Sequence, residues 1–241
     1  MYKKLAKQLY WYILGPLAAA RNYYRLENKY RAGKNLAEFD IEWSQQKFNR
    51  ISVINRIIEG MNSPVRYLEI GCAGNECFNS IAALDKTGVD PVAGGTHRQT
   101  SDDFFEENDR TFDLVFIDGL HTYEQCRKDA MNALSSLKVG GFVVFHDMLP
   151  RNWREEHVPR VQVDWTGDVW RVAVELMQTT GVDLRIFEID NGVAVAKKIS
   201  AEVAYFDDFD RLQDASFSDY VKIRKDMPLF NYVDSYDWLA S

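Results

Sequence analysis

Residues 65–75 read VRYLEIGCAGN, and residues 112–124 read FDLVFIDGLHTYE. Each stretch begins with a short apolar run of the length expected for a buried strand and continues into a turn that contains glycine. A helical pattern follows each one, over Glu76–Leu84 and over His121–Leu137. Strands that alternate with helices indicate a parallel sheet with right-handed crossover connections. The two stretches therefore predict an α/β fold.

The same alternation extends outward from these stretches. The periodicity predicts an amphipathic helix over Leu36–Glu59, a turn at Gly140-Gly141, a helix over Thr166–Thr179, and strands at Val65–Ile70, Gly88–Asp90, Phe112–Asp118, Phe142–His146, Asp183–Ile189 and Gly192–Lys197. Between the last two strands, Asn191-Gly192 supplies the pair of positive φ angles that a tight hairpin turn requires. We expect a Rossmann-like, doubly wound, mostly parallel sheet that ends in an antiparallel hairpin, with N-terminal helices and a C-terminal helical extension.

Composition limits the class of protein. The 241 residues are 46% hydrophobic and 27% charged, with a formal net charge of −7. These values indicate a globular chain, and the acidic balance argues against nucleic acid as the partner. The charge is uneven, because residues 1–34 carry eight basic residues and one acid, which leaves 21 basic and 35 acidic residues in the remainder. Three cysteines without a metal-ligand spacing exclude a structural zinc site and favour a reducing, cytoplasmic compartment.

The sequence divides into three parts: a basic, amphipathic helical extension over residues 1–60, a central domain over 61–199, and an acidic, aromatic extension over 200–241. The apolar run Leu9–Ala20 is interrupted by Gly15-Pro16 and is shorter than the roughly 20 residues of a spanning helix. Residues 1–20 therefore either pack on the domain or contact a partner or the inner face of a membrane, and their match to a secretory signal is weak. The tail is too aromatic for disorder, which predicts helical packing or an interface, with a homo-oligomer as one outcome.

Acidic residues follow all four predicted parallel strands. The first strand ends at Glu69 before Gly71, and the next three end at Asp90, at Asp118 and at the pair His146-Asp147. Ligands of open α/β sheets bind outside the carboxyl ends of the strands. The four ends are therefore expected to form one crevice.

The residues expected in this crevice, and their spacing in the sequence, favour an adenosine cofactor without phosphate. Asp90 follows Gly71 by 19 residues, close to the spacing at which an acid holds ribose hydroxyls. A dinucleotide site would have glycine at the positions of Ala73 and Glu76, and an acid there would repel a pyrophosphate. S-adenosylmethionine carries a sulfonium cation, which suits an acid-lined pocket.

Four elements in order, Tyr67–Asn75, Gly88–Pro91, Phe112–Glu124 and Gly140–Asp147, resemble class I S-adenosylmethionine-dependent methyltransferases. The D-G-x-H-x-Y-E and H-D signatures are similar to those of bacterial sugar and macrolide O-methyltransferases. The resemblance covers about residues 60–198 and includes the terminal hairpin. It departs from the family in having fewer glycines in the first turn and only Pro91–Thr100 between the second strand and the next helix.

The resemblance implies a role for each matching position. Glu69 and the turn residues Gly71, Cys72, Ala73 and Asn75 would line the methionine part, Asp90 would hold the ribose, Ser101 and Asp102 would lie by the adenine, and Asp118 would border the cofactor. It also implies a divalent ion, Mg²⁺ or Mn²⁺, on Asp118, His146 and Asp147. Mg²⁺ prefers oxygen ligands, so His146 makes Mn²⁺ or no metal equally consistent.

A hydroxyl acceptor needs help to lose its proton, and His121 lies three residues after Asp118, where a histidine can act as general base. The predicted catalytic residues are therefore His121, Asp118 and His146, with a local capping role as the other interpretation of His121. The arginine- and tryptophan-containing segment Met148–Trp165 suits a sugar ring or an anionic group, or is an ordinary surface loop. Gly167-Asp168-Val169-Trp170 resembles an element of the related proteins, and Asp168 suits the first turn of a helix.

These observations predict methyl transfer to a hydroxyl oxygen of a small molecule, a saccharide or a glycosylated metabolite. Methylation of a phenol or an amine is the nearest alternative. A hydroxylase-like enzyme on the same scaffold and a non-catalytic cofactor-binding or assembly protein also stay open.

Overall fold

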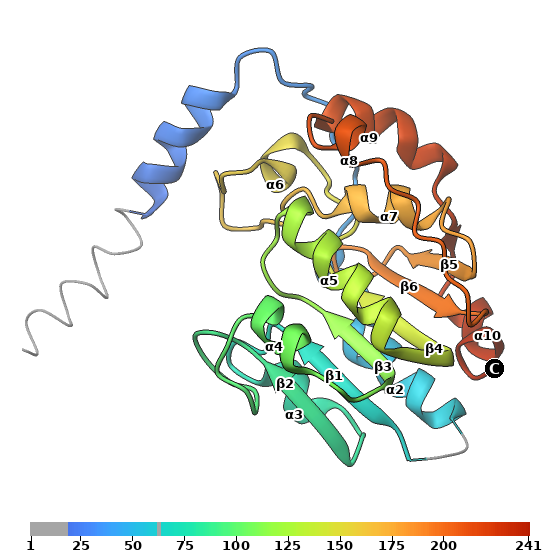
Figure 1. The fold of residues 1–241 in the computed structure, drawn as a ribbon. Helices are drawn as coiled ribbons and strands as arrows, with labels where there is room; N and C mark the ends of the chain where they lie inside the picture. The colour runs from blue at the N-terminus through green and yellow to red at the C-terminus, as the bar shows by residue number, and fades with distance from the viewer. Residues whose placement is uncertain (1–18, 62–63) are drawn as a thin grey trace, which may run out of the picture.

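The computed structural model describes residues 19–61 and 64–241. Its centre is a seven-stranded sheet with the order β2-β1-β3-β4-β6-β5-β7, flanked by helices on both faces (Figure 1). The strands are β1 Arg66–Ile70, β2 Asp85–Val89, β3 Phe112–Ile117, β4 Leu137–Phe145, β5 Val182–Phe187, β6 Val193–Lys198 and β7 Leu229–Phe230. The principal helices are α2 Arg50–Gly60, α3 Glu76–Ser80, α4 Ser101–Glu107, α5 Tyr123–Ser136, α6 Trp153–Glu156 and α7 Trp170–Leu176. The predicted fold class is confirmed.

The sheet register brings the predicted strand ends together. β1 is parallel to β2 on one side and to β3 on the other, so the strand order reverses beside it. Ile70 is paired with both Val89 and Ile117, and Ile117 is paired with Phe145. The residues that follow these four positions therefore leave the sheet at one edge, which is the switch point where ligands of open α/β sheets bind.

Alternation along the strands fills two cores. Leu68 and Val115 face the layer that contains α5 and α7, whereas Tyr67 and Phe116 face the layer that contains α2 and α3. All four side chains are fully buried. Because both faces of the sheet are covered, these strands read as nearly continuous apolar runs.

The antiparallel hairpin is present, with its turn one residue earlier than predicted. β6 is antiparallel to both β4 and β5. The residues at the turn centre are Asp190 and Asn191, with φ of 47° and 60°, and the Gly192 N–H donates to the Ile189 carbonyl at 2.8 Å. Both central residues thus adopt the left-handed conformation that this class of turn demands.

The helix predicted over Leu36–Glu59 is wrong in its first half. Between Leu36 and Asn49 the chain forms only the 3-10 turn η1 Trp43–Gln45. A capping box at Asn49 starts α2, and Phe39 upstream packs edge-on against Tyr220 of the tail. Tertiary packing therefore overrides the helical spacing of the apolar residues in 36–49.

Other predicted boundaries also differ, and the helix predicted over Glu76–Leu84 ends at Ser80 as α3. The Gly140-Gly141 position lies inside β4, which begins at Leu137, and the helix predicted over Thr166–Thr179 is shortened to α7. β2 begins at Asp85 rather than at Gly88.

The tail packs on the domain through helical segments, as predicted, and also contributes a strand. It contains α8 Phe209–Leu212, α9 Phe217–Ile223, η2 Arg224–Asp226, β7, η3 Val233–Ser235 and α10 Tyr236–Leu239. Leu212, Phe217 and Tyr220 are fully buried, and β7 pairs in parallel with β5.

At the other end, residues 19–30 are helical, and Leu26 and Tyr30 pack against the core. Most of the predicted contact segment 1–20 lies outside the described residues. Among the helices that the structure describes, none is long and apolar enough to cross a membrane.

Candidate active site

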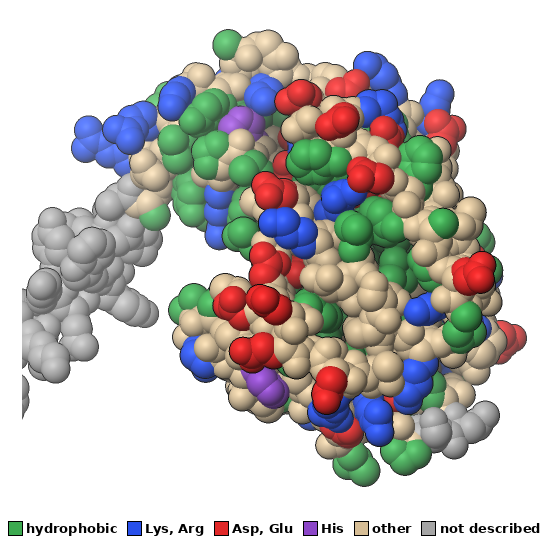
Figure 2. Space-filling model, viewed as in Figure 1, with side chains coloured by type: hydrophobic (Ala, Val, Ile, Leu, Met, Phe, Trp, Pro, Cys, Tyr) green, Lys and Arg blue, Asp and Glu red, His purple; other side chains and the backbone are tan. Residues whose placement is uncertain are grey.

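A cavity of about 1060 Å³ lies outside the carboxyl ends of the four parallel strands. This volume is at the upper end of the range of small-molecule sites, about 300–1,000 Å³. Figure 2 shows the surface hollowed between α4 and α6, with Asp and Glu side chains on the rim. The predicted site residues on its wall are Gly71, Ala73, Asp90, Ser101, Asp102, Asp118, His121, His146 and Asp147. The expected single crevice is therefore present.

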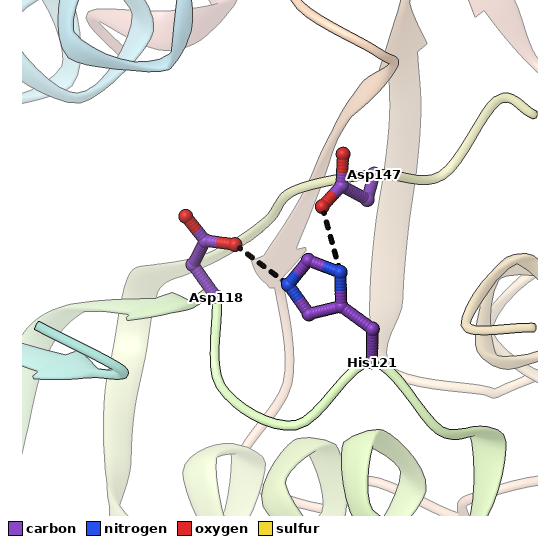
Figure 3. A group of neighbouring side chains, drawn as sticks. All are labelled: Asp118, His121 and Asp147. Atoms are coloured by element: carbon purple, nitrogen blue, oxygen red, sulfur yellow. Dashed lines mark ion pairs between the residues drawn. The ribbon is translucent and has the colours of Figure 1, made fainter. Parts of the chain in front are cut away.

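His121 lies between two of the predicted acids, as Figure 3 shows. Its Nε2 is 3.4 Å from Asp118 Oδ1, and its Nδ1 is 3.2 Å from Asp147 Oδ2. Asp118 follows β3 and Asp147 follows β4, whereas His121 lies in the loop before α5. Asp147 adopts a left-handed φ of 62°. The left-handed residue thus lies two positions after the end of β4, where its carboxylate contacts the imidazole of His121.

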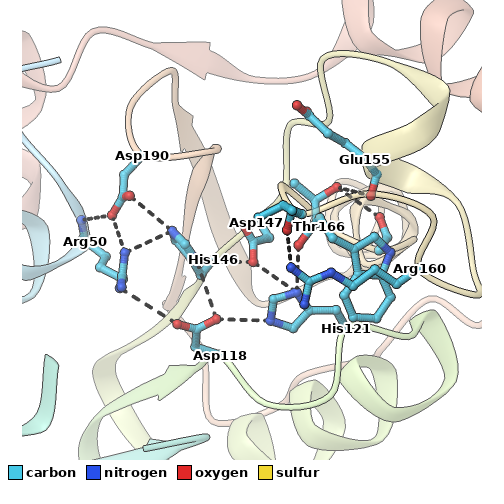
Figure 4. A network of polar contacts seen from close by, with 12 residues as sticks. Arg50, Asp118, His121, His146, Asp147, Glu155, Arg160, Thr166 and Asp190 are labelled. Carbon is cyan, nitrogen blue, oxygen red and sulfur yellow. Dashed lines mark hydrogen bonds and ion pairs between the residues drawn. The ribbon is translucent and has the colours of Figure 1, made fainter. Parts of the chain in front are cut away.

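A second histidine links the trio to residues that the sequence did not single out (Figure 4). His146 Nδ1 is 3.4 Å from Asp118 Oδ1 and 3.3 Å from Asp147 Oδ2, and its Nε2 is 3.4 Å from Asp190 Oδ1. Arg50, the first residue of α2, places Nη1 2.9 Å from Asp190 Oδ2. Arg50 and Asp190 come from segments outside 65–147, and no local pattern marks either of them.

The charges in this network stabilise one another. Burial opposes the charged form of His146, but the neighbouring Asp147 and Asp118 carboxylates outweigh it and raise its pKa well above the ordinary value. Burial likewise opposes ionisation of Asp118, yet His146 and a hydrogen bond from His121 hold the pKa of Asp118 far below its usual range. The pKa of Asp190 is lowered in the same way, against burial, by His146 and Arg50. Asp118 and Asp190 are therefore carboxylates at neutral pH, and His146 is a cation.

The two nitrogens of His121 have different partners. Nδ1 lies 3.2 Å from the carbonyl oxygen of Trp165, which can only accept a hydrogen bond. In neutral imidazole one nitrogen carries the proton and the other is the base. In the neutral imidazole this carbonyl favours the proton on Nδ1 and leaves Nε2 as the basic nitrogen. In the imidazolium Nε2 also carries a proton and faces Asp118, and, against the effect of burial, the surrounding acceptors raise the pKa of His121 above its ordinary value.

The same residues have the donors for a divalent ion. Asp118, His121 and Asp147 each offer one ligand atom, and these atoms lie within 4.8 Å of one another. Asp147 Oδ1 is buried and has no hydrogen-bond partner among the described residues, which is costly for a carboxylate oxygen unless a cation meets it. Two carboxylates and an imidazole suit Mn²⁺ and tolerate Mg²⁺. This set contains His121 in the place that the sequence prediction gave to His146.

Asp90 ties the first turn to the loop after β2. Its Oδ2 accepts the Ala73 N–H at 2.9 Å, and its Oδ1 accepts those of Val92 and Ala93 at 2.7 and 2.8 Å. Burial opposes ionisation, but these three donors lower the pKa of Asp90 below its ordinary value. A carboxylate has about four acceptor positions, so one remains for a hydroxyl in the cavity.

The first turn is shaped by backbone contacts inside the protein. A Cβ on Gly71, whose φ is +90°, would lie 2.1 Å from the Asp118 carbonyl oxygen. The glycine is thus required by the neighbouring strand end, and Ala73 and Asn75 adopt positive φ without being glycine. These conformations explain how the turn forms with fewer glycines than the family pattern.

Three predicted cofactor residues lie behind the cavity wall. The Asn75 Oδ1 accepts the Gly95 N–H at 2.7 Å, and Cys72 is buried beneath the turn. Glu69 accepts a hydrogen bond from the Tyr67 hydroxyl at 2.6 Å, and burial raises the pKa of Glu69 to about 7. These side chains support the turn rather than line the cavity.

The far end of the cavity combines polar and apolar groups. The Gln125 amide donates to Ser101 Oγ at 3.1 Å and to Asp102 Oδ1 at 2.8 Å. Leu120 also lines the cavity and is 60% exposed. Sequence reasoning missed Gln125, although its position one turn into the helix after His121 was a usable signal.

The segment that contains the strand-end acids is similar to a known protein family. Residues 68–148 match a family described as a methyltransferase domain. This part of the chain is therefore similar to a methyltransferase domain. The match begins within β1 and ends just after Asp147, so the methyltransferase domain contains Asp118, His121 and Asp147. It confirms the methyltransferase resemblance drawn from the sequence.

Solved structures of methyltransferases are similar to this chain at low identity. An O-methyltransferase from Bacillus cereus in complex with SAH is 16% identical over 74% of this chain and 90% of its own, with a TM-score of 0.45. The O-methyltransferase TomG from Streptomyces achromogenes, in complex with SAM, is 13% identical over 76% and 90%, with a TM-score of 0.46. The MycE methyltransferase of the mycinamycin pathway, in complex with Mg, SAH and mycinamycin VI, is 17% identical over 78% and 56%, with a TM-score of 0.41. No curated protein matches the chain.

Proposed function

We propose that this methyltransferase domain moves the methyl group of S-adenosylmethionine to a hydroxyl oxygen of a small-molecule acceptor, a saccharide or a glycosylated metabolite. One observation carries the proposal: a histidine is held between two carboxylates on the wall of the cavity formed by the strand ends. Such a group can accept the proton that a hydroxyl loses during methyl transfer.

The cofactor would occupy the part of the cavity that β1 and β2 border. Three features of this part of the cavity suit S-adenosylmethionine. They are the free acceptor position of Asp90, the exposed Leu120 side chain, and the Gln125–Asp102 pair at the far end. Bound S-adenosylmethionine supplies an electrophilic methyl group. Asp90 would hold a ribose hydroxyl, Leu120 would pack on the adenine, and Ser101 and Asp102 would meet its polar edge.

His121 would act as the general base through Nε2. The Trp165 carbonyl keeps the proton on Nδ1, so Nε2 is the atom that receives the acceptor proton. Asp118, 3.4 Å from Nε2, and Asp147, 3.2 Å from Nδ1, then stabilise the imidazolium that forms. This division of roles follows the general logic of a base oriented by a second group.

A divalent ion would be held by Asp118, Asp147 and a histidine. When bound, it lowers the pKa of a coordinated hydroxyl. The Asp147 Oδ1 atom is the free ligand position that the protein itself offers. One nitrogen cannot be both a ligand and the base, so in the metal-bound form His121, whose donor atom lies within 4.8 Å of those of Asp118 and Asp147, would be the nitrogen ligand rather than the base. The surrounding carboxylates favour the charged form of His146, the ligand that the sequence resemblance implies.

The acceptor would lie against the wall formed by Val163, Asp164, Trp165 and Asn191. This wall combines an aromatic ring with carboxylate and amide groups that can bind several hydroxyls. A saccharide has the matching chemistry, with one apolar ring face and many hydroxyl edges. This match favours a sugar over a simple phenol.

The proposal predicts a product one methyl heavier than the acceptor. Incubation with S-adenosylmethionine and a panel of sugars and nucleotide sugars, followed by mass spectrometry, is the direct measurement.

In calorimetry, S-adenosylhomocysteine should bind the wild-type protein, and Asp90→Ala should weaken binding by roughly tenfold or more, since a hydrogen bond to a charged group contributes about 1.5–3 kcal/mol.

The exposed loop residue Asp109 provides the matched control, because Asp109→Ala removes a carboxylate outside the cavity. If the wild-type protein does not bind S-adenosylhomocysteine, the proposal is wrong. Binding without a methylated sugar, phenol or amine would favour the non-catalytic alternative.

We also propose that residues 1–20 bring the enzyme to an anionic membrane surface. Support comes from Lys3, Lys4 and Lys7 beside Tyr10–Tyr12 in the sequence, a composition typical of interfacial segments. Leu26 and Tyr30 anchor the helix over 19–30 to the core, so a truncation after residue 20 leaves the anchor in place.

Deleting residues 1–20 should therefore abolish co-sedimentation with vesicles that contain anionic lipid, while methyl transfer to a soluble acceptor is retained. Neutral vesicles and a Lys3→Glu, Lys4→Glu, Lys7→Glu variant of the full chain are the controls. Equal co-sedimentation of the full and truncated chains would exclude membrane contact through this segment.

A further inference from the structure

The segment Trp165–Asp168 contacts both the imidazole ring and the backbone of His121. The Trp165 carbonyl faces Nδ1 at 3.2 Å, and the Trp165 ring stacks on the imidazole with centroids 5.3 Å apart and planes 19° from parallel. Gly167 lies so close that a Cβ there would be 1.8 Å from the His121 carbonyl oxygen. With φ of +66°, Gly167 also has a conformation that other residues rarely adopt.

Asp168 fixes the start of the helix that follows His121. Its Oδ1 accepts the Tyr123 N–H at 2.6 Å, which satisfies a donor at the N-terminus of α5. The residue at the N-cap position, Thr122, makes no side-chain capping bond. The cap is thus supplied by a residue 45 positions later in the chain. Capping bonds contribute about 1 kcal/mol and fix the first turn of a helix.

The segment is itself held by the region around α6. The N–H groups of Thr166 and Gly167 both donate to the Glu155 carbonyl at 3.0 Å, and the Trp165 indole N–H donates to the His157 carbonyl at 2.9 Å. Asp168 Oδ2 is 2.8 Å from Arg171 Nη1. These bonds tie the segment to α6 and α7 rather than to the strand ends that position the acids.

We propose that Trp165, Gly167 and Asp168 are positioning residues that set the orientation and the tautomer of His121. The inference rests on the proposed role of His121 as general base. Asp168 fixes the chain just after His121, Gly167 allows the close backbone contact, and the Trp165 carbonyl and ring fix the imidazole. Because Trp165 also lines the cavity, an acceptor that contacts Trp165 is aligned by the same group that aligns the base.

Asp168 gives the sharpest test, because it is absent from the cavity wall and reaches His121 only through α5. Asp168→Ala should lower kcat by about 10²-fold, the effect of misplacing a reacting group by about 1 Å, while the affinity for S-adenosylhomocysteine changes less than twofold. Asp168→Asn keeps an oxygen that can accept the Tyr123 N–H and should restore most of the rate. Thr122→Ala is the matched control at the helix start and should leave kcat unchanged.

A second readout reports the position of His121 directly. In ¹H–¹⁵N correlation spectra of the histidine rings, assigned with a His121→Ala spectrum, Asp168→Ala and Trp165→Ala should shift the His121 signals. Trp165→Phe keeps an aromatic ring and the backbone carbonyl and should shift them less. A loss of stability alone would lower the melting temperature without moving the His121 signals of the folded protein.

The outcomes separate this inference from the proposed function. If His121→Ala retains turnover, the assignment of the base is wrong, whatever the Asp168 and Trp165 variants do. If His121→Ala is inactive but Asp168→Ala keeps both its kcat and its His121 signals, the positioning role is wrong and the base assignment stands.

Discussion

Replacing His121 with alanine is expected to reduce methyl transfer by about 10²- to 10⁴-fold, the usual contribution of a positioned general base. The reason is geometric, since Nε2 is the basic nitrogen of a ring held between Asp118 and Asp147. The affinity for S-adenosylhomocysteine should stay nearly intact, because the His121 side chain is not among the groups proposed to hold the ribose and the adenine. Steady-state kinetics with calorimetry measures both quantities.

The matched control is His97→Ala, since His97 is an exposed histidine outside the cavity wall. Its turnover should equal that of the wild-type protein. Added imidazole should partly restore the His121→Ala variant if a missing base is the cause. Full turnover in His121→Ala would falsify the assignment, and a parallel loss of cofactor affinity would indicate a binding role.

The acidic residues of the cavity wall could be predicted from the sequence because their positions depend on strand ends. A buried parallel strand is a continuous apolar run, and the acid or glycine after it marks where the chain leaves the sheet. Asp90, Asp118 and Asp147 were found in this way, and the register of β1 with β2 and β3 brings the first two to one edge. The local apolar pattern and the rule that ligands bind at strand ends were sufficient to predict these three residues.

The remainder of the site depends on contacts between distant segments. Arg50 meets Asp190 across 140 residues, and Asp168 caps α5 from 45 residues away. No local pattern marks Arg50 or Asp190 as a site residue. The sequence related Asp168 only to the first turn of the helix that follows it, not to the start of α5. The same limit explains why the helix predicted over Leu36–Glu59 is wrong in its first half, because Tyr220, which packs against Phe39, lies in the tail.

Removing divalent ions is the second change with a large expected effect. Dialysis against EDTA should lower turnover by at least tenfold, and Mn²⁺ or Mg²⁺ should restore it, because removal of the ion would remove the group that lowers the pKa of the acceptor hydroxyl. Asp147→Asn should weaken Mn²⁺ binding by about 10- to 100-fold, measured by calorimetry or by the electron paramagnetic resonance signal of free Mn²⁺, since it removes one of the charged ligands.

A variant of Asp190 distinguishes the loss of a metal ligand from a disturbance of the surrounding charge network. It contacts His146 and Arg50 but lies outside the group of three potential ligands, so Asp190→Asn should retain most of the Mn²⁺ affinity that Asp147→Asn loses. An enzyme that keeps full turnover in EDTA and binds no Mn²⁺ would exclude the metal. In that case the buried Asp147 carboxylate serves only to hold the proton on His121 Nδ1, and the base alone must supply the proton transfer.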